Sequence, residues 1–430
     1  MYAVTQTKLT ATQPAAILAL AAQFTDFFAF ENPQQPTQLF GFEAFSEQAP
    51  TNLATAVSEI DTWAQSLRLN IPQAAQEHLK LMGSFAFEDQ PTAQTNIWGD
   101  FANGRFFLPK YTLEKTAADT YDLFVVANSL AQAQKQAAQF KQALAQQVPL
   151  DLTPNDSVQQ TELAVNDWAQ AVGQTVEKLQ QAQLQKVVLA RPLTVESNQT
   201  FSAEKAWLNL RHKNPETYHV LYRHRQLGFV SATPEHLIRF DHQKFHTVAI
   251  AGTCPTGKTA AETEQLGTAL LNDAKNRQEQ QFVTQTIIQN LQALHAEIHY
   301  SETPDLLVNK NVQHLATPIW GHLTSKTTPF QLIATLHPTP ALGGLPRNLA
   351  RQTIANTEIL RRGLFGGPIG YLNFAQQGEF VVGIRSALLN QKTATLFAGA
   401  GIVKDSDPKQ EVVETRLKFQ PMLQSLLEGN

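Results

Sequence analysis

The stretch Gln185-Lys186-Val187-Val188-Leu189-Ala190-Arg191 decides how the rest of this chain is interpreted. The run is short and apolar, β-branched at its start and bracketed by two cations, which predicts a buried strand with a lysine at its entry. Such a lysine either extends its amine into water or is held in a functional site. Because the run alone favours the first explanation, its meaning depends on residues elsewhere in the sequence.

The composition is that of a globular protein with enough apolar residues for a large core. Of the 430 residues, 43% are hydrophobic and 16% are charged, values that argue against intrinsic disorder. The 33 basic and 37 acidic residues give a net charge of −4, so no basic excess points to a polyanionic partner. We therefore expect neither nucleic acid nor a membrane as a partner.

The single cysteine and the N-terminal segment bear on the cellular compartment. Cys254 stands alone, which excludes an internal disulfide and a cysteine-based metal site. The N-terminus lacks a charged region followed by an apolar one, and no stretch approaches the roughly 18 consecutive apolar residues of a membrane span. The expectation is a cytoplasmic protein in a reducing environment.

Two regions are expected, and the clearest connector between them is residues 148–160, which hold two prolines, two aspartates and an asparagine. Residues 1–150 mix Gln/Ala-rich helical segments with short strands, and Ser129 is expected to cap a helix that runs to Gln147. Residues 161–423 are expected to form the catalytic region and to begin with a helix over 161–184. We expect both regions to belong to one compact unit.

Strands predominate after that helix. Five are predicted, at Lys186–Leu193, Tyr218–Arg223, Leu227–Ser231, His236–Asp241 and Phe245–Ala251. Several are joined by short turns, which favours antiparallel pairing over βαβ units. A long helix is predicted from about Ala261 to Leu294, and a final one starts near Pro408 with Asp407 as its cap. The predicted fold class is α+β, with large, sandwich-like antiparallel sheets and helices packed outside.

One motif indicates a different function. Residues 252–259 satisfy the P-loop pattern G-x-x-x-x-G-K-[ST] between a predicted strand and a predicted helix. Against nucleotide binding, Pro255 removes a backbone N–H where a phosphate needs donors, and no later apolar strand ends in an aspartate suited to Mg²⁺. Since the neighbouring strands also look antiparallel, a P-loop NTPase is kept only as a remote alternative.

Three glutamates form a candidate metal site. Glu279 precedes Val283 by four residues, on a helical stripe predicted to be buried. Glu411 and Glu414 are spaced i,i+3 on one helical face, where like charges repel unless a cation intervenes. Any one of them alone would be an ordinary solvated helix charge. Together with an anionic substrate, their oxygens suit Mg²⁺.

Three further residues have the chemistry of a site. Glu235 follows Pro234 at a strand–turn junction, where it is either a turn residue or a general acid with a pKa raised by burial. His314 is either a satisfied core histidine or a site residue. Arg385 stands inside a predicted apolar strand, where arginine tends to face an anion or a buried carboxylate. The local sequence leaves the roles of Glu235 and His314 open.

Together with the lysine run, five segments resemble one family, the chorismate-utilising enzymes. They are Thr233-Pro234-Glu235, Gln278-Glu279-Gln280, Gln313-His314-Leu315-Ala316-Thr317, Val382-Gly383-Ile384-Arg385 and Glu411-Val412-Val413-Glu414-Thr415. The resemblance is strong over about 161–423 and weaker before it. The chain departs from the family at Asn276 and Gln280, where Asp and His are frequent, and at His236, where Arg is frequent.

The resemblance implies a cofactor and a reaction. In the family, Mg²⁺ holds the chorismate carboxylate, a nucleophile adds at ring C2, and the C4 hydroxyl leaves. By resemblance, Glu279, Glu411 and Glu414 bind the metal, Lys186 deprotonates water as the neutral amine, and Glu235 protonates the departing hydroxyl. The lysine matches the water-using members, whereas the ammonia-using anthranilate and aminodeoxychorismate synthases lack it.

Water-using members either stop at isochorismate or go on to eliminate pyruvate and give salicylate. The pair Ala341-Leu342 resembles isochorismate synthases, since salicylate synthases tend to have threonine-alanine there, and the bulky Leu342 is expected to shape the pocket. Salicylate synthase is the alternative within the family. Menaquinone biosynthesis is the expected pathway and a catechol siderophore the other candidate. The expected state is a monomer or weak homodimer.

The remaining contacts with chorismate are also implied by the resemblance. Hydrogen-bond donors are expected from Thr253 and the backbone near Gly399, and positive charge from Arg385 and Lys418. The full predicted substrate-binding set is Gly252, Thr253, His314, Ala341, Leu342, Phe365, Arg385, Gly399 and Lys418. The competing hypothesis is a catalytically inactive scaffold, and the intact lysine, acid and glutamates argue against it.

Overall fold

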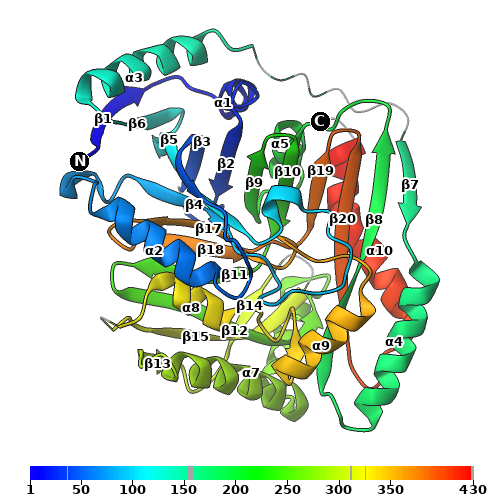
Figure 1. The fold of residues 1–430 in the computed structure, drawn as a ribbon. Coiled ribbons are helices and arrows are strands. Elements are labelled where there is room, and N and C mark those ends of the chain that lie inside the picture. The colour runs from blue at the N-terminus through cyan, green and yellow to red at the C-terminus, as the bar shows by residue number, and fades with distance from the viewer. Residues whose placement is uncertain are drawn as a thin grey trace.

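The computed structural model describes residues 1–35, 37–148, 150, 152, 158–309, 312–324 and 326–427. One continuous sheet folds back on itself to make two layers, with helices on both outer sides (Figure 1). All pairings between its labelled strands are antiparallel. The predicted α+β class with sandwich-like antiparallel sheets is therefore confirmed.

The first layer contains strands from both ends of the chain. In spatial order its strands are β1 (Ala3–Leu9), β6 (Thr120–Ala127), β5 (Arg105–Ala117), β3 (Gln38–Gln48), β2 (Asp26–Glu31), β9 (Tyr218–His224), β10 (Leu227–Thr233), β19 (Ser386–Asn390), β20 (Thr393–Ile402) and β8 (Lys186–Ser197). The short strands β7 (Val158–Glu162) and β16 (Gly344–Leu345) pair with the outer edge of β8. The lysine run thus begins a strand near the edge of this layer.

The second layer branches from the first at β5. Residues 105–107 of β5 pair with β4 (Lys80–Ser84), whereas residues 111–117 of the same strand pair with β6. From β4 the layer continues through β17 (Pro368–Asn373), β18 (Gly378–Val382), β11 (His236–Asp241), β12 (Lys244–Pro255) and β15 (Val312–His322), with β13 (Glu297–Tyr300) and β14 (Asp305–Val308) on the far edge of β15. One strand therefore supplies hydrogen bonds to both layers.

Three apolar clusters follow from this layering. The cluster between the layers is aromatic and includes Phe28, Tyr222 and Phe229. Two others join each layer to its helices, since a sheet buries its second face only against another element. Five helices pack against the first layer: α1 (Pro14–Ala21), α3 (Leu130–Ala145), α4 (Val165–Gln180), α5 (Ala203–Lys213) and α10 (Pro408–Leu427). Four helices pack against the second layer: α2 (Ala56–Arg68), α6 (Ala260–Asn272), α7 (Ala274–Gln292) and α8 (Pro329–Leu336). Helix α9 (Arg347–Thr357) packs on β8.

Several predicted elements are confirmed. Each of the five predicted strands after residue 184 forms, as β8, β9, β10, β11 and β12. The Ser129 hydroxyl accepts from the backbone N–H of Gln132 at the start of α3, and the Asp407 carboxylate accepts from the N–H of Lys409 and Gln410 at the start of α10. Capping by short polar side chains was readable because it depends only on residues one turn apart.

Other expectations were wrong. The helix expected over 261–294 is two helices, because Asp273 ends α6 and caps α7. The helix expected from residue 161 begins at Val165, and Val158–Glu162 instead pairs with β8. Residues 149, 151 and 153–157 of the predicted connector lie outside the described residues. The P-loop interpretation fails, since β12 runs on to Pro255 in a ladder with β15 and forms no phosphate loop there.

No helix in the described ranges combines the length and apolarity that a membrane crossing needs.

The close pairing of β17 with β18 within the second layer can be tested at Gly370. It pairs with Phe380 across these two strands, and a Cβ at Gly370 would lie 2.0 Å from the Glu379 carbonyl oxygen. We expect Gly370→Ala to lower the free energy of unfolding by about 1–3 kcal/mol through overpacking, measured by urea denaturation. Gly173→Ala in α4 is the matched control, because its Cβ would lie 3.8 Å from Pro408. Equal stabilities of the two variants would contradict the pairing.

Candidate active site

The Lys186 side chain lies where β8 meets α7 and β20. Its amine is 3.6 Å from a carboxylate oxygen of Glu279 on α7. Across the ladder, Gly401 of β20 leaves room for it, since a Cβ there would lie 3.4 Å from Lys186 Cε. The backbone of Lys186 pairs with Leu345 on the other edge. The lysine is thus held by strands on both sides while its amine remains partly exposed.

Glu235 occupies the short link between β10 and β11. Its backbone N–H donates to the Thr233 hydroxyl at 3.1 Å, and the Thr339 hydroxyl donates to its carboxylate at 3.4 Å. The side chain keeps some contact with solvent, yet so much protein surrounds the carboxyl that lost hydration raises its pKa to about 7, against the lowering effects of Thr339 and of the nearby charge of Lys186. An acid with this pKa carries a transferable proton at neutral pH.

Thr253, His314 and Gly252 lie together where β12 faces β15. Thr253 pairs with His314 across a bulge at Gly252, whose φ is +68°, and the Thr253 hydroxyl and His314 Nδ1 are 2.9 Å apart. Burial lowers the pKa of His314, which favours the neutral ring. A Cβ at Gly252 would lie 3.1 Å from Asn276 on α7, one turn before Glu279. This group therefore borders the Lys186–Glu279 pair.

A second charged group lies in the middle of α10. The Lys418 amine donates to the Gly399 carbonyl at 2.8 Å and pairs with Glu414 at 2.6 Å. Burial lowers the pKa of Arg385 while the charge of Glu414 opposes that shift, so these two side chains interact. Because Gly399 and Gly401 are alternate residues of β20, this group borders the strand that also faces Lys186.

Two expectations about charged side chains were wrong. Glu279 is 45% exposed, and the buried stripe of α7 runs through Gln280, whose amide donates to the Ala249 carbonyl and the Thr317 hydroxyl. A neutral amide is buried here at lower cost than a carboxylate. Arg385 is not within a strand, since β18 ends at Val382 and β19 begins at Ser386, and its φ is +49°.

The predicted metal ligands are only partly assembled. Burial, together with the charge of Glu414, raises the pKa of Glu411, as expected of two carboxylates on one helical face. Glu279 projects from a different helix toward Lys186. Across the described ranges, no three His, Cys, Asp or Glu side chains lie near enough to hold a metal ion together.

Three predicted substrate contacts lie on or beneath the site surface. Phe365 is 4% exposed and stacks on Phe397 with ring centroids 5.3 Å apart. Leu342 is 7% exposed within the apolar cluster that also holds Val187 and Ala350, and its neighbour Ala341 is exposed. The expectation that the Leu342 side chain shapes the pocket therefore has no support from its position.

Three residues that the sequence did not predict, Thr339, Glu358 and Arg362, contact the residues or strands that form the site. Thr339 belongs to the turn before Gly343 but carries no motif signal of its own. Glu358 and Arg362 are spaced i,i+4 and form a buried ion pair against β8. That spacing was a readable signal for an ion pair. Its target on β8, however, lies more than 160 residues away in the sequence.

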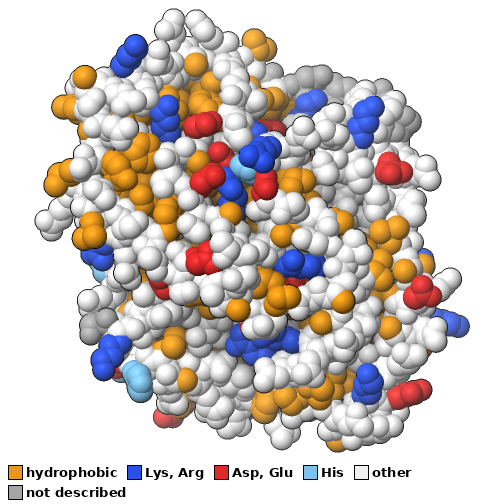
Figure 2. Space-filling view, in the orientation of Figure 1, with side chains coloured by type: hydrophobic (Ala, Val, Ile, Leu, Met, Phe, Trp, Pro, Cys, Tyr) orange, Lys and Arg blue, Asp and Glu red, His pale blue; other side chains and the backbone are white. Residues whose placement is uncertain are grey.

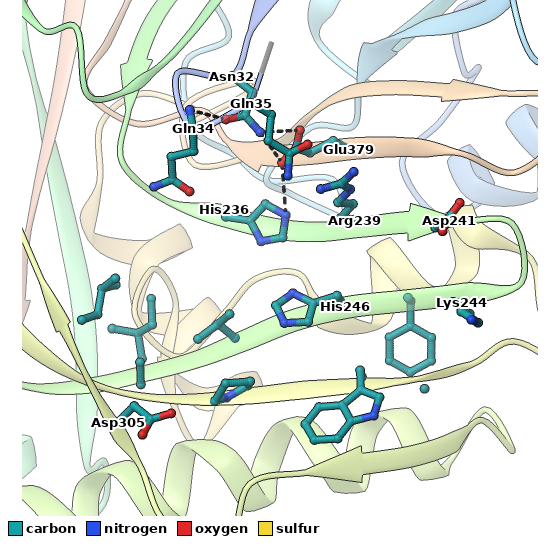
Figure 3. Close-up of a pocket in the computed structure, with 18 of the residues that line it drawn as sticks. Asn32, Gln34, Gln35, His236, Arg239, Asp241, Lys244, His246, Asp305 and Glu379 are labelled. Carbon is teal, nitrogen blue, oxygen red and sulfur yellow. Dashed lines mark hydrogen bonds and ion pairs between the residues drawn. The ribbon is translucent and has the colours of Figure 1, made fainter. Parts of the chain in front are cut away.

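A cavity of about 970 Å³ lies beside this site and not within it. Pro234 and His236 line the cavity, whereas Glu235 between them does not. Figure 3 shows Asn32, His236 and Arg239 gathered around Glu379 above β11, and the carboxylate of Glu379 accepts from Asn32 at 3.0 Å. Lys186 and Thr339, which both act on the Glu235 carboxyl, are likewise absent from the cavity lining.

The surface drawn in Figure 2 carries acidic and basic side chains interspersed among apolar and neutral ones.

Comparisons with known proteins identify the family of the chain. The sequence matches the chorismate binding enzyme family over residues 2–427. It is 34% identical over 352 residues to isochorismate synthase MenF of Bacillus subtilis, covering 80% of this chain and 74% of that protein. It is 37% identical to the salicylate biosynthesis isochorismate synthase of Pseudomonas aeruginosa, over 60% of this chain and 54% of that one.

The solved structure of MenF, the menaquinone-specific isochorismate synthase from Escherichia coli, superposes on this chain with a TM-score of 0.84. The two sequences are 26% identical, and the superposition covers 99% of this chain and 95% of the other. The chain belongs to the chorismate-binding enzyme family.

Proposed function

We propose that the protein is an isochorismate synthase, which converts chorismate reversibly to isochorismate by adding water at C2 and releasing the C4 hydroxyl. The observation that carries this proposal is that Lys186 lies near enough for its charge to act on Glu235, whose carboxyl has a pKa of about 7. A base and an acid that act on one ring suit exchange of one hydroxyl for another. Relatives with the name isochorismate synthase support the same assignment.

The two catalytic groups have separate tasks in this proposal. Lys186 accepts a proton from the water that attacks C2, and Glu235 gives its proton to the hydroxyl that leaves C4. Since one water enters and one departs, the reaction is balanced without a further reactant. The Glu279 carboxylate, 3.6 Å from the Lys186 amine, keeps the amine directed toward the site.

The anionic groups of chorismate would be held by the side chains beside β20 and β12. Arg385 and Lys418 supply positive charge, and Thr253 supplies a hydroxyl oriented by His314 at 2.9 Å. Gly252 and Gly399 allow the backbone to approach the ring closely. The buried Phe365 and Leu342 support this surface from below.

The carboxylates near the site fit Mg²⁺ by their chemistry. Glu411 and Glu414 are mutually repelling oxygen donors on one helix, and Glu279 is an exposed carboxylate on another. Hard cations prefer such ligands, completed by water and substrate. We propose that these three glutamates hold Mg²⁺ together with the substrate. When bound, the ion supplies positive charge to a substrate carboxylate.

We also propose a pathway, a compartment and an oligomeric state. The relative named as menaquinone-specific supports menaquinone biosynthesis, and the relative named for salicylate biosynthesis supports a salicylate route as an alternative. A catechol siderophore stays the other candidate pathway. We infer a cytoplasmic enzyme, since the lone Cys254 needs no oxidising compartment. A monomer or weak homodimer, and one folding unit made of residues 1–150 and 161–423, stay predictions.

Turnover of chorismate tests the proposed function. With Mg²⁺ present we expect isochorismate, detected by HPLC, in a reversible equilibrium with chorismate. With EDTA we expect the rate to fall to background. Pyruvate, measured through lactate dehydrogenase, should stay absent. Stoichiometric pyruvate would identify a salicylate synthase, and full activity in EDTA would remove the metal from the reaction.

Substitutions at the two catalytic groups should separate their roles. We expect Lys186→Ala to lower kcat at least about a hundredfold, the scale of lost general-base catalysis, with an unchanged circular dichroism spectrum. Glu235→Gln should lower kcat and kcat/KM together. In the wild type, the rate should fall as pH rises through about 7, because Glu235 then loses the proton it must donate. A wild-type rate that is flat from pH 6 to 9 would exclude Glu235 as the acid.

The cavity beside the site offers a test of where the substrate binds. Trp320 forms part of its wall, so Trp320→Ala should change KM for chorismate less than about twofold if the substrate lies on the Glu235 side. A tenfold or larger rise in KM would place the substrate in the cavity. Thr253→Val on the other side should raise KM in the same assay.

A further inference from the structure

Strand β8 lacks strand partners along part of its outer edge. In the described part of the chain, β16 pairs with Lys186 and Val187, and β7 pairs with residues 193–197. Between them the Val188 N–H donates to the Gly343 carbonyl at 2.9 Å, and two side chains bind further backbone groups of the edge. The Glu358 carboxylate accepts from the Ala190 N–H at 2.7 Å, and the Arg362 guanidinium donates to the Val188 carbonyl at 2.7 Å. A buried ion pair thus takes the place of a neighbouring strand.

The same guanidinium also holds the turn behind Glu235. Its other terminal nitrogen donates to the Leu342 carbonyl at 2.9 Å. The carbonyl of Thr339 accepts from the N–H groups of Leu342 and Gly343, so Thr339 and Leu342 belong to one rigid turn. The Thr339 hydroxyl then donates to Glu235 at 3.4 Å. Arg362 therefore binds both the strand that carries Lys186 and the turn whose Thr339 hydroxyl donates to Glu235.

We propose that Arg362 is a positioning residue that fixes the spacing between Lys186 on β8 and Glu235 on the Thr339 turn. The inference rests on the proposed function, because it assigns a task to the acid and base named there. Arg362 itself touches neither the reacting atoms nor the substrate. It acts through the Val188 and Leu342 carbonyls, which its planar fork reaches at the same time.

The burial of this pair supports a role beyond packing. Arg362 is 1% and Glu358 is 8% exposed, and burial raises the pKa of Glu358 despite the adjacent guanidinium. Buried ion pairs contribute little net stability compared with apolar residues of similar volume. Here the pair joins β8 to the carbonyl of Leu342, one residue before the backbone bond from the Val188 N–H to the Gly343 carbonyl at 2.9 Å, so its geometry sets the angle of the turn that carries Thr339 relative to the strand.

Arg362→Lys is the central variant. The lysine keeps a positive charge beside Glu358, so the buried carboxylate stays paired, but one ammonium on a flexible stem does not hold both carbonyls in fixed geometry. We expect kcat for isochorismate formation to fall about 10- to 100-fold, the scale of small misplacements of reacting groups, with KM changed less than threefold. The alkaline limb of the pH profile should also move to higher pH, since loss of the Thr339 hydrogen bond raises the pKa of Glu235.

Two further variants keep the test decisive. The double variant Glu358→Gln/Arg362→Gln removes both buried charges at once and should show the same fall in kcat and the same shift of the limb, even if its melting temperature differs from that of Arg362→Lys. Thr339→Val breaks only the contact with Glu235. It should therefore move the limb in the same direction with a smaller loss of kcat.

Arg361 provides the matched control. It is a neighbouring arginine that is 8% exposed, donates to the Ala102 carbonyl at 2.7 Å and lies 3.7 Å from Glu88, away from β8. Arg361→Gln should lower the melting temperature without shifting the pH profile. If the Arg362 variants are folded at the assay temperature and keep the wild-type kcat and alkaline limb, Arg362 is merely structural and the proposal is wrong. If wild-type protein makes no isochorismate, the proposed function fails instead.

Discussion

The hydrogen bonding of β8 along both of its edges is the constraint on which this molecule depends. On one edge it forms a ladder with β20 from Val187 to Glu196. That ladder places Gly401 and Gly399 beside Lys186 and the cations of α10. On the other edge, its hydrogen-bond partners include β16, β7 and the Glu358–Arg362 pair. A strand with fixed neighbours on both sides does not slip in register, so its first residue is presented at a constant position.

The charged side chains around this strand differ in how far they are buried. Glu235 loses enough hydration to hold its proton near neutral pH, while Glu279 and Glu414 stay about half exposed and each has a lysine partner. The proposed acid is thus separated in environment from the carboxylates proposed to bind the metal ion. One small region therefore supports opposite protonation states of the same functional group.

The parts of the fold that sequence could predict depend on near neighbours in the chain. Apolar runs bounded by turns identified β8 to β12, and the caps at Ser129 and Asp407 followed from single side chains. The stripe Val283, Ile287 and Leu291 of α7 is buried as predicted, but at its N-terminal end the buried face passes through Gln280 and leaves Glu279 exposed. Thr339 and Arg362 escaped notice because their partners lie about 100 to 170 residues away, and only the folded chain brings them together.

The branching of the sheet at β5 has a consequence for how such a protein is inherited. Residues 1–150 supply β2, which completes the edge of β9, and β4, which completes the edge of β17. A gene encoding only the later residues would yield a protein with two bare strand edges, which recruit other chains. Selection for solubility therefore acts on the early residues even though the proposed acid, base and metal ligands all lie later. Recombination that replaced residues 1–150 alone would have to preserve both the β2–β9 ladder and the β4–β17 ladder.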